Sequence, residues 1–291
     1  MTEQLGLALG GGGARGLAHL GALIALEEAG VPISVIAGTS MGAAMGAAKS
    51  IGADLHLIAK VLESLDLNDL LQVSDSTVRE LQKIIGRSMV EYVRGSAWKE
   101  EDSAPHDLVR LRELFRLLTA GKRFEESAIP FAAVAADLET GDRVILREGL
   151  LCDAVVASTS VPGVFSPVAC NGQFLIDGGV VDKLPVDVVI DMGATAVIAI
   201  DTGAPLDREI TTCLDAVLQA QRVTSYQLTN LQLILAAERL KSKLIVISPD
   251  VGWIRMFGFE HTREAIQAGK DAVNARLDDI RALVGLTASE V

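Results

Sequence analysis

Short apolar runs alternate with amphipathic segments along most of the chain. The runs at 5–9, 34–37, 130–136 and 194–200 are strand-sized and almost continuously apolar, which is typical of strands buried on both faces of a sheet. Between the first two, apolar residues recur at helical spacing over 17–24. Strands that alternate with helices in this way predict an α/β fold of three layers, α/β/α, around a central and mostly parallel sheet.

The same alternation continues toward the C-terminus. Apolar patterning predicts a returning strand, a short helix, a strand, a helix, a long helix, a last strand and a closing helix at 143–146, 150–157, 174–176, 185–192, 211–240, 244–247 and 261–283. We expect residues 1–291 to form a single domain, in which 205–291 is a C-terminal helical part that completes it.

The segment 52–127 has a different character, because it contains helical stretches and no convincing strand. Two of them, 77–93 and 108–118, carry apolar residues along one face. Since this segment is locally basic within an acidic chain, two interpretations stay open. It is an insert of helices that covers one side of the sheet, or a cap that offers an interfacial surface near the site.

Composition narrows the class of protein. The net charge of −12 argues against general attraction to nucleic acid or to anionic bilayers. The three cysteines are too few and too scattered for a disulfide framework or a zinc site, which fits a reducing compartment. No signal peptide and no run of membrane-spanning length is visible, so we expect a cytoplasmic protein.

The pentapeptide Gly38-Thr39-Ser40-Met41-Gly42 follows a predicted strand and precedes a helix-compatible segment. A strand that turns sharply into a helix through Gly-x-Ser-x-Gly is a nucleophile elbow, which places the serine hydroxyl at a helix N-terminus. Glycines flank the serine because a Cβ would obstruct the close approach of strand and helix. Taken alone, the pentapeptide also fits an ordinary strand-to-helix turn.

A second glycine-rich loop, 10–16, follows the first strand. It matches the Gly-x-Gly-x-x-Gly fingerprint of dinucleotide sites, but the second strand lacks the acidic residue that would hold a ribose. We favour an anion cradle beside Ser40, in which successive backbone N–H groups point at one oxygen and Arg15 braces the loop or adds charge.

A serine nucleophile needs a group that accepts its proton. His19 lies on the first helix, where we expect it to pack or to be solvated, and His261 lies in the chain order of an α/β-hydrolase triad but at a helix start. Asp177 is better placed, because it ends an apolar strand and two glycines follow it. A carboxylate screened from water has a raised pKa, which suits a base.

Four blocks in this order resemble the patatin-like phospholipase family, particularly its small bacterial and NTE-type members. They are Gly11 to Gly16, Gly38 to Gly42, Ala157 to Pro167, and Asp177-Gly178-Gly179, with a family-like turn at 137–141. The chain departs at Lys183, where relatives often carry Asn. The resemblance spans roughly residues 5 to 200 and leaves the helical segment and the C-terminal part weakly covered.

The resemblance implies a lipid acyl hydrolase with a Ser–Asp dyad, no histidine, no metal and no organic cofactor, acting on esters of phospholipids, lysophospholipids or neutral lipids. The expected site comprises the nucleophile Ser40 and the base Asp177, the oxyanion-hole residues Gly11, Gly12, Gly13 and Met41, and the supporting residues Arg15, Gly38, Gly42, Gly178 and Gly179.

Other interpretations stay open beside this one. An acyltransferase on a related scaffold would use the same serine with an acceptor other than water, and a non-catalytic lipid-binding protein would keep the fold without the chemistry. The loop 252–259 carries three of the chain's few aromatic residues. It either packs under the last helix or lines an acyl pocket and touches a lipid interface, so peripheral contact with the inner face of a membrane is a further partner interpretation.

Overall fold

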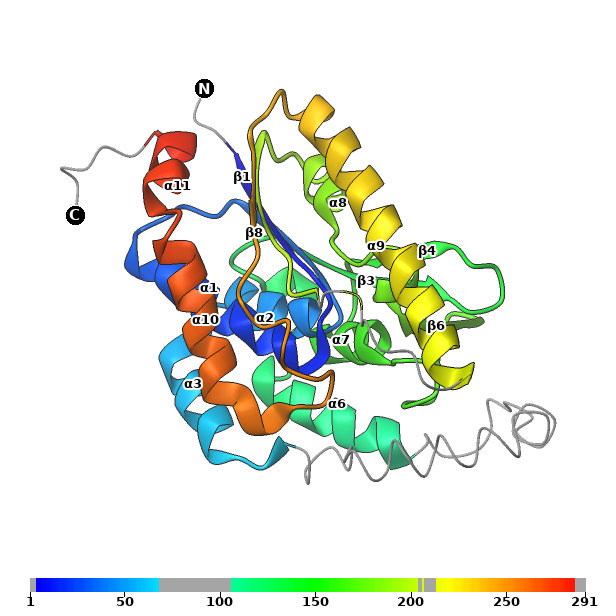
Figure 1. The fold of residues 1–291 in the computed structure, drawn as a ribbon. Helices are drawn as coiled ribbons and strands as arrows, with labels where there is room; N and C mark the ends of the chain where they lie inside the picture. Colours follow the sequence, from blue (N-terminus) through cyan, green and yellow to red (C-terminus); the bar gives the residue numbers. More distant parts are fainter. Residues whose placement is uncertain (1–3, 68–105, 204–205, 207–212, 286–291) are drawn as a thin grey trace.

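The computed structural model describes residues 4–67, 106–203, 206 and 213–285. An eight-stranded sheet lies at its centre, in the order β5-β6-β3-β2-β1-β7-β8 with β4 paired to β3 (Figure 1). The strands are β1 (Leu5–Leu9), β2 (Val35–Thr39), β3 (Phe131–Asp137), β4 (Arg143–Leu146), β5 (Val168–Cys170), β6 (Gln173–Asp177), β7 (Ala196–Ile200) and β8 (Leu244–Ile247).

The sheet is mixed. Strands β1, β2, β3, β7 and β8 run parallel to one another, whereas β4, β5 and β6 pair antiparallel. Of these parallel strands, β1, β2, β3 and β7 are buried on both faces, as their continuous apolar runs predict, whereas alternate residues of β8 are only partly buried. The predicted α/β class with a mostly parallel central sheet is therefore confirmed.

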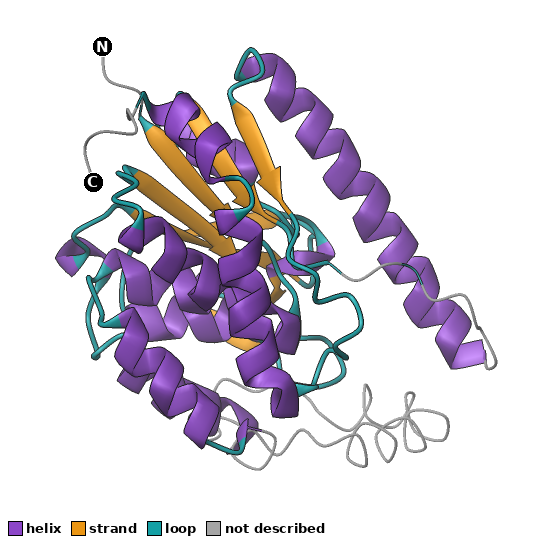
Figure 2. Ribbon diagram, turned by 60° about the vertical axis from the view of Figure 1, so that its left-hand side comes forward, coloured by secondary structure: helices purple, strands orange, loops and turns teal. Residues whose placement is uncertain are grey.

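Helices cover both faces of the sheet (Figure 2). They are α1 (Ala18–Glu28), α2 (Met41–Ser50), α3 (Leu55–Ser64), α6 (His106–Leu118), α7 (Leu151–Thr159), α8 (Val186–Asp191), α9 (Cys213–Arg239), α10 (Thr262–Asn274) and α11 (Leu277–Val284), with short 3₁₀ turns η1 (Gly13–Leu17), η2 (Phe124–Glu126), η3 (Gly178–Val180) and η4 (Phe259–His261). None of the helices in the described ranges combines the length and the apolar character that crossing a bilayer requires.

Two hydrophobic clusters define the three layers. Leu7 and Ile36 point into a cluster with α1, α2, α3, α6, α7, α10 and α11, whereas Ala8 and Ala37 point into a cluster with α8 and α9. Small residues face α8 because that helix lies close. A Cβ at Gly6 would come within 3.0 Å of the Val189 Cβ. The alternation of side chains along each strand thus separates a thick helical layer from a thin one.

Two details differ from the sequence-based expectations, and one predicted helix is not tested. Strand β5 was not predicted, although Asn171 and Gly172 both have positive φ and join it to β6 in the manner of an Asn-Gly hairpin. The closing helix is two helices, because Arg276 leaves the helical conformation (φ −117°, ψ 13°) while the apolar spacing continues past it. The helix predicted at 77–93 lies outside the described residues.

Candidate active site

The register of the sheet brings Ser40 and Asp177 together. On β3, Ala133 pairs with both β2 and β4, and Ala135 pairs with both β4 and β6. Because a strand has two edges and β4 occupies one of them, β2 and β6 must share the other edge end to end. Strand β2 ends where Thr39 pairs with Val134, and β6 ends at Asp177 opposite Ala135. Ser40, which follows β2, and Asp177, the last residue of β6, therefore meet.

Ser40 occupies a strained turn between β2 and α2. Its φ of 55° and ψ of −127° lie in a region that non-glycine residues rarely adopt. A Cβ at Gly38 would lie 2.4 Å from the Gly42 carbonyl oxygen, and one at Gly42 would lie 2.2 Å from the Leu9 carbonyl oxygen. Both flanking glycines are thus required by close backbone approach, as the elbow predicts.

The Asp177 carboxylate is buried beside the serine. Its pKa is raised to about 6 because burial disfavours the charged form, while hydrogen bonds from the Ser40 hydroxyl and the Gly179 amide oppose this shift. The Gly179 N–H donates to Oδ1 at 2.7 Å. A Cβ at Gly178 would lie 2.3 Å from the Val134 carbonyl oxygen, so the turn after Asp177 also needs glycine.

The C-terminal end of α7 holds both residues. The Ser40 amide donates to Ser158 Oγ at 2.8 Å, and Ser158 Oγ–H donates to the Val134 carbonyl at 2.5 Å. Two residues later, the Ser160 carbonyl accepts from the Asp177 amide at 2.9 Å. Neither serine has a role predicted from the sequence, although both lie in the third block of the resemblance.

The glycine loop after β1 is tied to its surroundings at several backbone atoms. The Gly10 carbonyl lies 2.6 Å from His19 Nε2, and the Gly11 amide donates to the Lys183 carbonyl at 2.9 Å. The Gly11 N–H is therefore engaged, so an oxyanion hole in this loop would draw on the N–H groups of Gly12 and Gly13. A Cβ at Gly12 would meet Thr202 Oγ1 at 2.4 Å.

Arg15 braces this loop and is 8% exposed. Its Nε donates to the Thr202 carbonyl at 3.2 Å and its Nη1 to the Ile254 carbonyl at 3.0 Å. The neighbouring Ala14 amide donates to the Met256 carbonyl at 2.7 Å. Of the two predicted roles for Arg15, the contacts support bracing, and they connect the glycine loop to the aromatic loop 252–259.

Apolar side chains from distant segments gather beside the elbow. Met41, the first residue of α2, packs against a buried cluster that includes Leu17, Ile254 and Phe259. Phe165 and Phe257 pack on the same cluster and are partly buried. This cluster packs the loop 252–259 against the first residue of α2, directly after Ser40.

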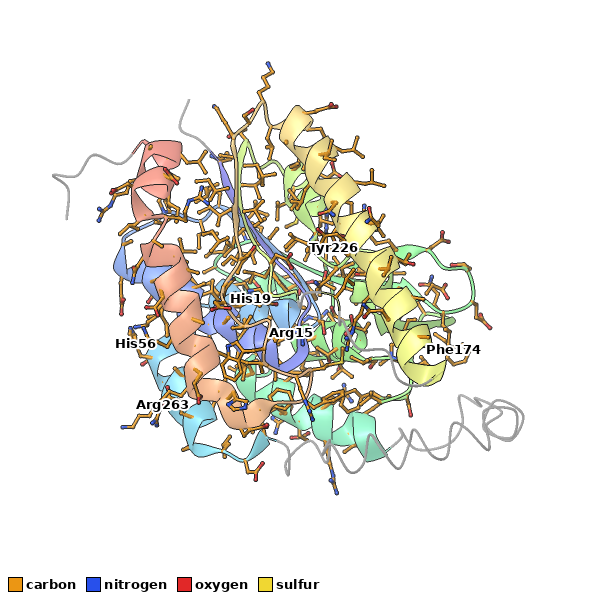
Figure 3. The ribbon with its side chains drawn as sticks, in the orientation of Figure 1. Arg15, His19, His56, Phe174, Tyr226 and Arg263 are labelled. Carbon is orange, nitrogen blue, oxygen red and sulfur yellow. The ribbon has the colours of Figure 1, made fainter. Side chains whose placement is uncertain are left out.

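His19 and His261 make their contacts with groups other than Ser40. His19 is completely buried, and burial lowers its pKa to about 4, so the ring is neutral at pH 7 (Figure 3). It contacts Gly10 and, at 3.4 Å, Thr202 Oγ1. His261 makes an edge contact with the Trp253 ring, and its ring nitrogens lie 3.7 Å and 3.6 Å from the Glu260 and Glu264 carboxylates at the surface.

The family model described as "Patatin-like phospholipase" matches residues 7–190. The chain belongs to this family. The matched range includes the glycine loop, the elbow, the end of α7 and Asp177, and it stops before the loop 252–259. Within the described ranges, no three His, Cys, Asp or Glu side chains gather where they could hold a metal ion.

Relatives of this patatin-like chain include longer proteins. An uncharacterised NTE family protein of Mycobacterium tuberculosis is 30% identical over 94% of this chain and 46% of its own length, so the chain spans about half of it. Lysophospholipase NTE1 of Mycosarcoma maydis is 31% identical over 69% of this chain and 10% of its own. Among solved structures, VipD from Legionella pneumophila matches with a TM-score of 0.46 and 16% identity, covering 96% of this chain and 67% of that one.

Proposed function

We propose that this protein is a serine hydrolase of lipid carboxylic esters, with Ser40 as nucleophile and Asp177 as base. One observation carries the proposal: Ser40, on a strained elbow, lies beside the buried Asp177 carboxylate. The pKa of Asp177 is raised to about 6 by burial, against the effect of the Ser40 hydroxyl, and this value suits a base at neutral pH. Membership of the patatin-like family, and the names of relatives such as lysophospholipase NTE1, support lipid as the substrate class.

The proposed reaction has two steps. Ser40 Oγ attacks the ester carbonyl carbon while Asp177 accepts the hydroxyl proton. The N–H groups of Gly12, Gly13 and Met41 then hold the oxyanion, which collapses as the ester C–O bond breaks. Asp177 passes the proton to the leaving alkoxide. In the second step, Asp177 takes a proton from water as the water attacks the acyl-enzyme, and Ser40 leaves with that proton.

Labelling with a fluorophosphonate probe tests the nucleophile. We expect a single adduct on Ser40, loss of labelling in Ser40→Ala, and strongly reduced labelling in Asp177→Asn, because Asn cannot accept the serine proton. Rates with p-nitrophenyl butyrate should fall by about 10² to 10⁴-fold in Asp177→Asn. The double variant should be about as slow as Ser40→Ala alone, because residues of one catalytic unit are not additive. A folded protein that neither labels nor hydrolyses esters would contradict the proposal.

The two alternatives predict different outcomes of the same experiment. A non-catalytic lipid-binding protein would not label at Ser40. An acyltransferase would label but would release little free fatty acid until an acyl acceptor is supplied, which product analysis by mass spectrometry detects. We favour hydrolysis because the relatives with informative names are described as a lysophospholipase and an esterase.

A further inference from the structure

The loop after η3 contacts three parts of the proposed site through its backbone. The Asp182 amide donates to the Gly178 carbonyl at 2.8 Å, next to the base. The Asp182 carbonyl accepts from Thr39 Oγ1 at 2.8 Å, directly before the nucleophile. The adjacent Lys183 carbonyl accepts from the Gly11 amide at 2.9 Å. The backbone groups of two consecutive residues therefore fix the positions of base, nucleophile and glycine loop relative to one another.

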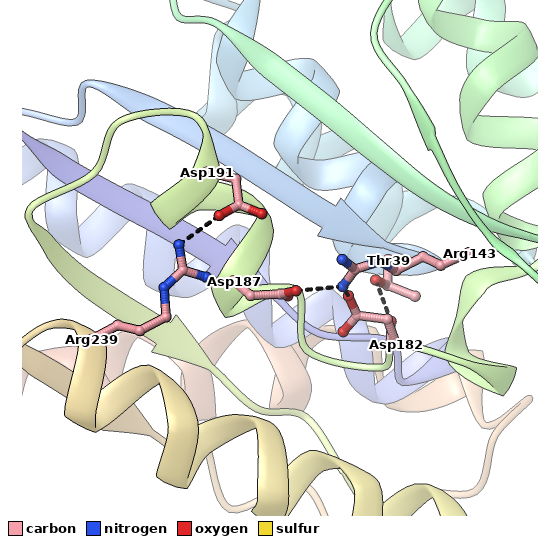
Figure 4. Close-up of polar contacts among 6 residues, drawn as sticks. All are labelled: Thr39, Arg143, Asp182, Asp187, Asp191 and Arg239. Carbon is pink, nitrogen blue, oxygen red and sulfur yellow. Dashed lines mark hydrogen bonds and ion pairs between the residues drawn. The ribbon is translucent and has the colours of Figure 1, made fainter.

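One guanidinium group anchors this loop to the sheet. Arg143, the first residue of β4, donates from Nη1 to Asp182 Oδ2 at 2.6 Å and from the same nitrogen to Asp187 Oδ2 at 2.7 Å (Figure 4). The Asp182 side chain is completely buried, whereas Arg143 and Asp187 are about one-third exposed. The buried carboxylate at the centre of the loop is thus held in place from β4.

The charges of the two carboxylates explain why Asp182 needs the Arg143 guanidinium. Two carboxylates share one guanidinium, and the pKa of Asp182 is raised to about 6 by burial and by the nearby Asp187, against the effect of Arg143 and of a hydrogen bond with Gln232. Without the guanidinium, the two acidic side chains would repel each other, and the buried one would lose its main counter-ion. The loop would then be expected to shift, together with the carbonyl groups that it presents.

We infer that Arg143 and Asp182 are positioning residues: through the Asp182 and Lys183 carbonyls, this ion pair holds Thr39 and Gly11 so that Ser40, Asp177 and the glycine loop keep their mutual geometry. This inference rests on the proposed function for its catalytic consequence. A misplacement of reacting groups by about 1 Å costs on the order of 10²-fold in rate. The ion pair touches none of the reacting atoms, so its effect should fall on kcat.

The test compares Arg143→Gln with Arg143→Lys, using p-nitrophenyl butyrate. We expect Arg143→Gln to lower kcat by about 10- to 100-fold, with KM within about two-fold of wild type and an unchanged pH midpoint. Arg143→Lys should recover most of kcat, because a single nitrogen makes both bonds and an ammonium group can replace it. Arg239→Gln is the matched control. It removes an ion pair of the same length, with Asp191, between the neighbouring helices α9 and α8 (Figure 4), and should leave kcat unchanged.

Variants of Thr39 test the same positioning role if Arg143→Gln folds poorly. Thr39→Val removes the hydroxyl that donates to the Asp182 carbonyl and keeps the side-chain shape, whereas Thr39→Ser keeps the hydroxyl. We expect Val to lower kcat and Ser to retain it. In the double variant of Thr39→Val and Arg143→Lys, the fold-loss in kcat should not exceed the product of the two single fold-losses. Equal kcat in Thr39→Val and Thr39→Ser would overturn the inference.

Hydrogen exchange separates failure of this inference from failure of the proposed function. In Arg143→Gln, amides of Gly10 to Gly13 and of Thr39 to Ala43 should exchange faster by at least 10-fold, while Arg239→Gln should match wild type there. This readout needs no activity, so it decides the inference even if wild-type protein does not hydrolyse esters. Wild-type protection in both segments of Arg143→Gln would overturn the positioning role, whatever the fate of the Ser40 proposal.

Discussion

Ser158 Oγ accepts a hydrogen bond from the amide of Ser40 at 2.8 Å, across 118 positions of the chain. The Ser40 backbone has a positive φ, which costs about 1–3 kcal/mol. Such a conformation persists only where contacts with the surrounding structure stabilise it. Ser158 supplies such support, because its oxygen also donates to the Val134 carbonyl and so fixes the elbow to β3.

Ser158→Ala should therefore lower both stability and activity. The buried Ser40 amide loses its acceptor, which costs about 1–3 kcal/mol in the free energy of unfolding, measured by urea denaturation. We expect kcat for p-nitrophenyl butyrate to fall at least 10-fold, because the nucleophile is less firmly placed. Ser50→Ala is the control, since Ser50 is equally buried at the far end of α2 and donates to the Ala47 carbonyl. Full kcat in Ser158→Ala would show that the elbow holds without this bond.

Asp177→Asn should stabilise the protein above pH 6 while it reduces activity. The folded-state pKa of Asp177 is raised from 3.8 to about 6, so burial favours the protonated carboxyl. The stability that this group contributes is fully present below pH 3.8 and is lost as the pH rises through about 6. Asn resembles the neutral form at every pH. We expect a gain on the order of 3 kcal/mol at pH 8 that disappears near pH 3.8, measured by urea unfolding across this range.

Several features of the site could be predicted because they leave a residue-type signature. Gly38, Gly42 and Gly178 stand where a Cβ would collide with backbone, and only glycine satisfies this requirement. Strands β1, β2, β3 and β7 could be predicted for a similar reason, because burial on both faces demands continuous apolar runs. The pattern therefore predicted which residues approach the backbone closely and which strands form the centre of the sheet.

The contacts that support the site have no such residue-type signature in the sequence. The Lys183 carbonyl that holds Gly11 belongs to the backbone and could be offered by any residue, and the end-to-end meeting of β2 and β6 depends on the register of β3. Strand β5 was missed although Asn171-Gly172 was a readable hairpin signal. The single-domain assignment and the site roles stay predictions.

His19 provides a test of whether an imidazole takes part in proton transfer. Its Nε2 lies 2.6 Å from the Gly10 carbonyl, and its pKa of about 4 keeps it neutral at pH 7. His19→Gln offers an amide nitrogen near the position of Nε2, whereas His19→Leu offers no donor. We expect Gln to retain most of kcat and Leu to lose about 10-fold, with the pH midpoint of activity unchanged in both. A loss in His19→Gln as large as that in Ser40→Ala would instead favour a histidine base.

Trp253 tests substrate access. Its side chain is 56% exposed, and it lies in the loop whose Ile254 and Met256 carbonyls accept hydrogen bonds from Arg15 and Ala14 of the glycine loop. Exposed tryptophan is favoured at lipid interfaces, because its indole combines an apolar ring system with a polar N–H group. We therefore propose that this loop meets the acyl chains of a lipid surface next to the site, as the sequence left open.

Trp253→Ala should then weaken hydrolysis of dispersed long-chain phospholipid at least several-fold more than hydrolysis of soluble p-nitrophenyl butyrate, and it should reduce sedimentation with phosphatidylcholine vesicles. Tyr226→Ala is the matched control, because Tyr226 is an aromatic side chain of similar exposure, 53%, on α9. Tyr226→Ala should change neither the ratio of phospholipid hydrolysis to p-nitrophenyl butyrate hydrolysis nor the sedimentation with vesicles. An equal loss of both activities in Trp253→Ala would mean that Trp253 supports the loop through its contact with His261, whose rings are 4.8 Å apart, and does not meet lipid.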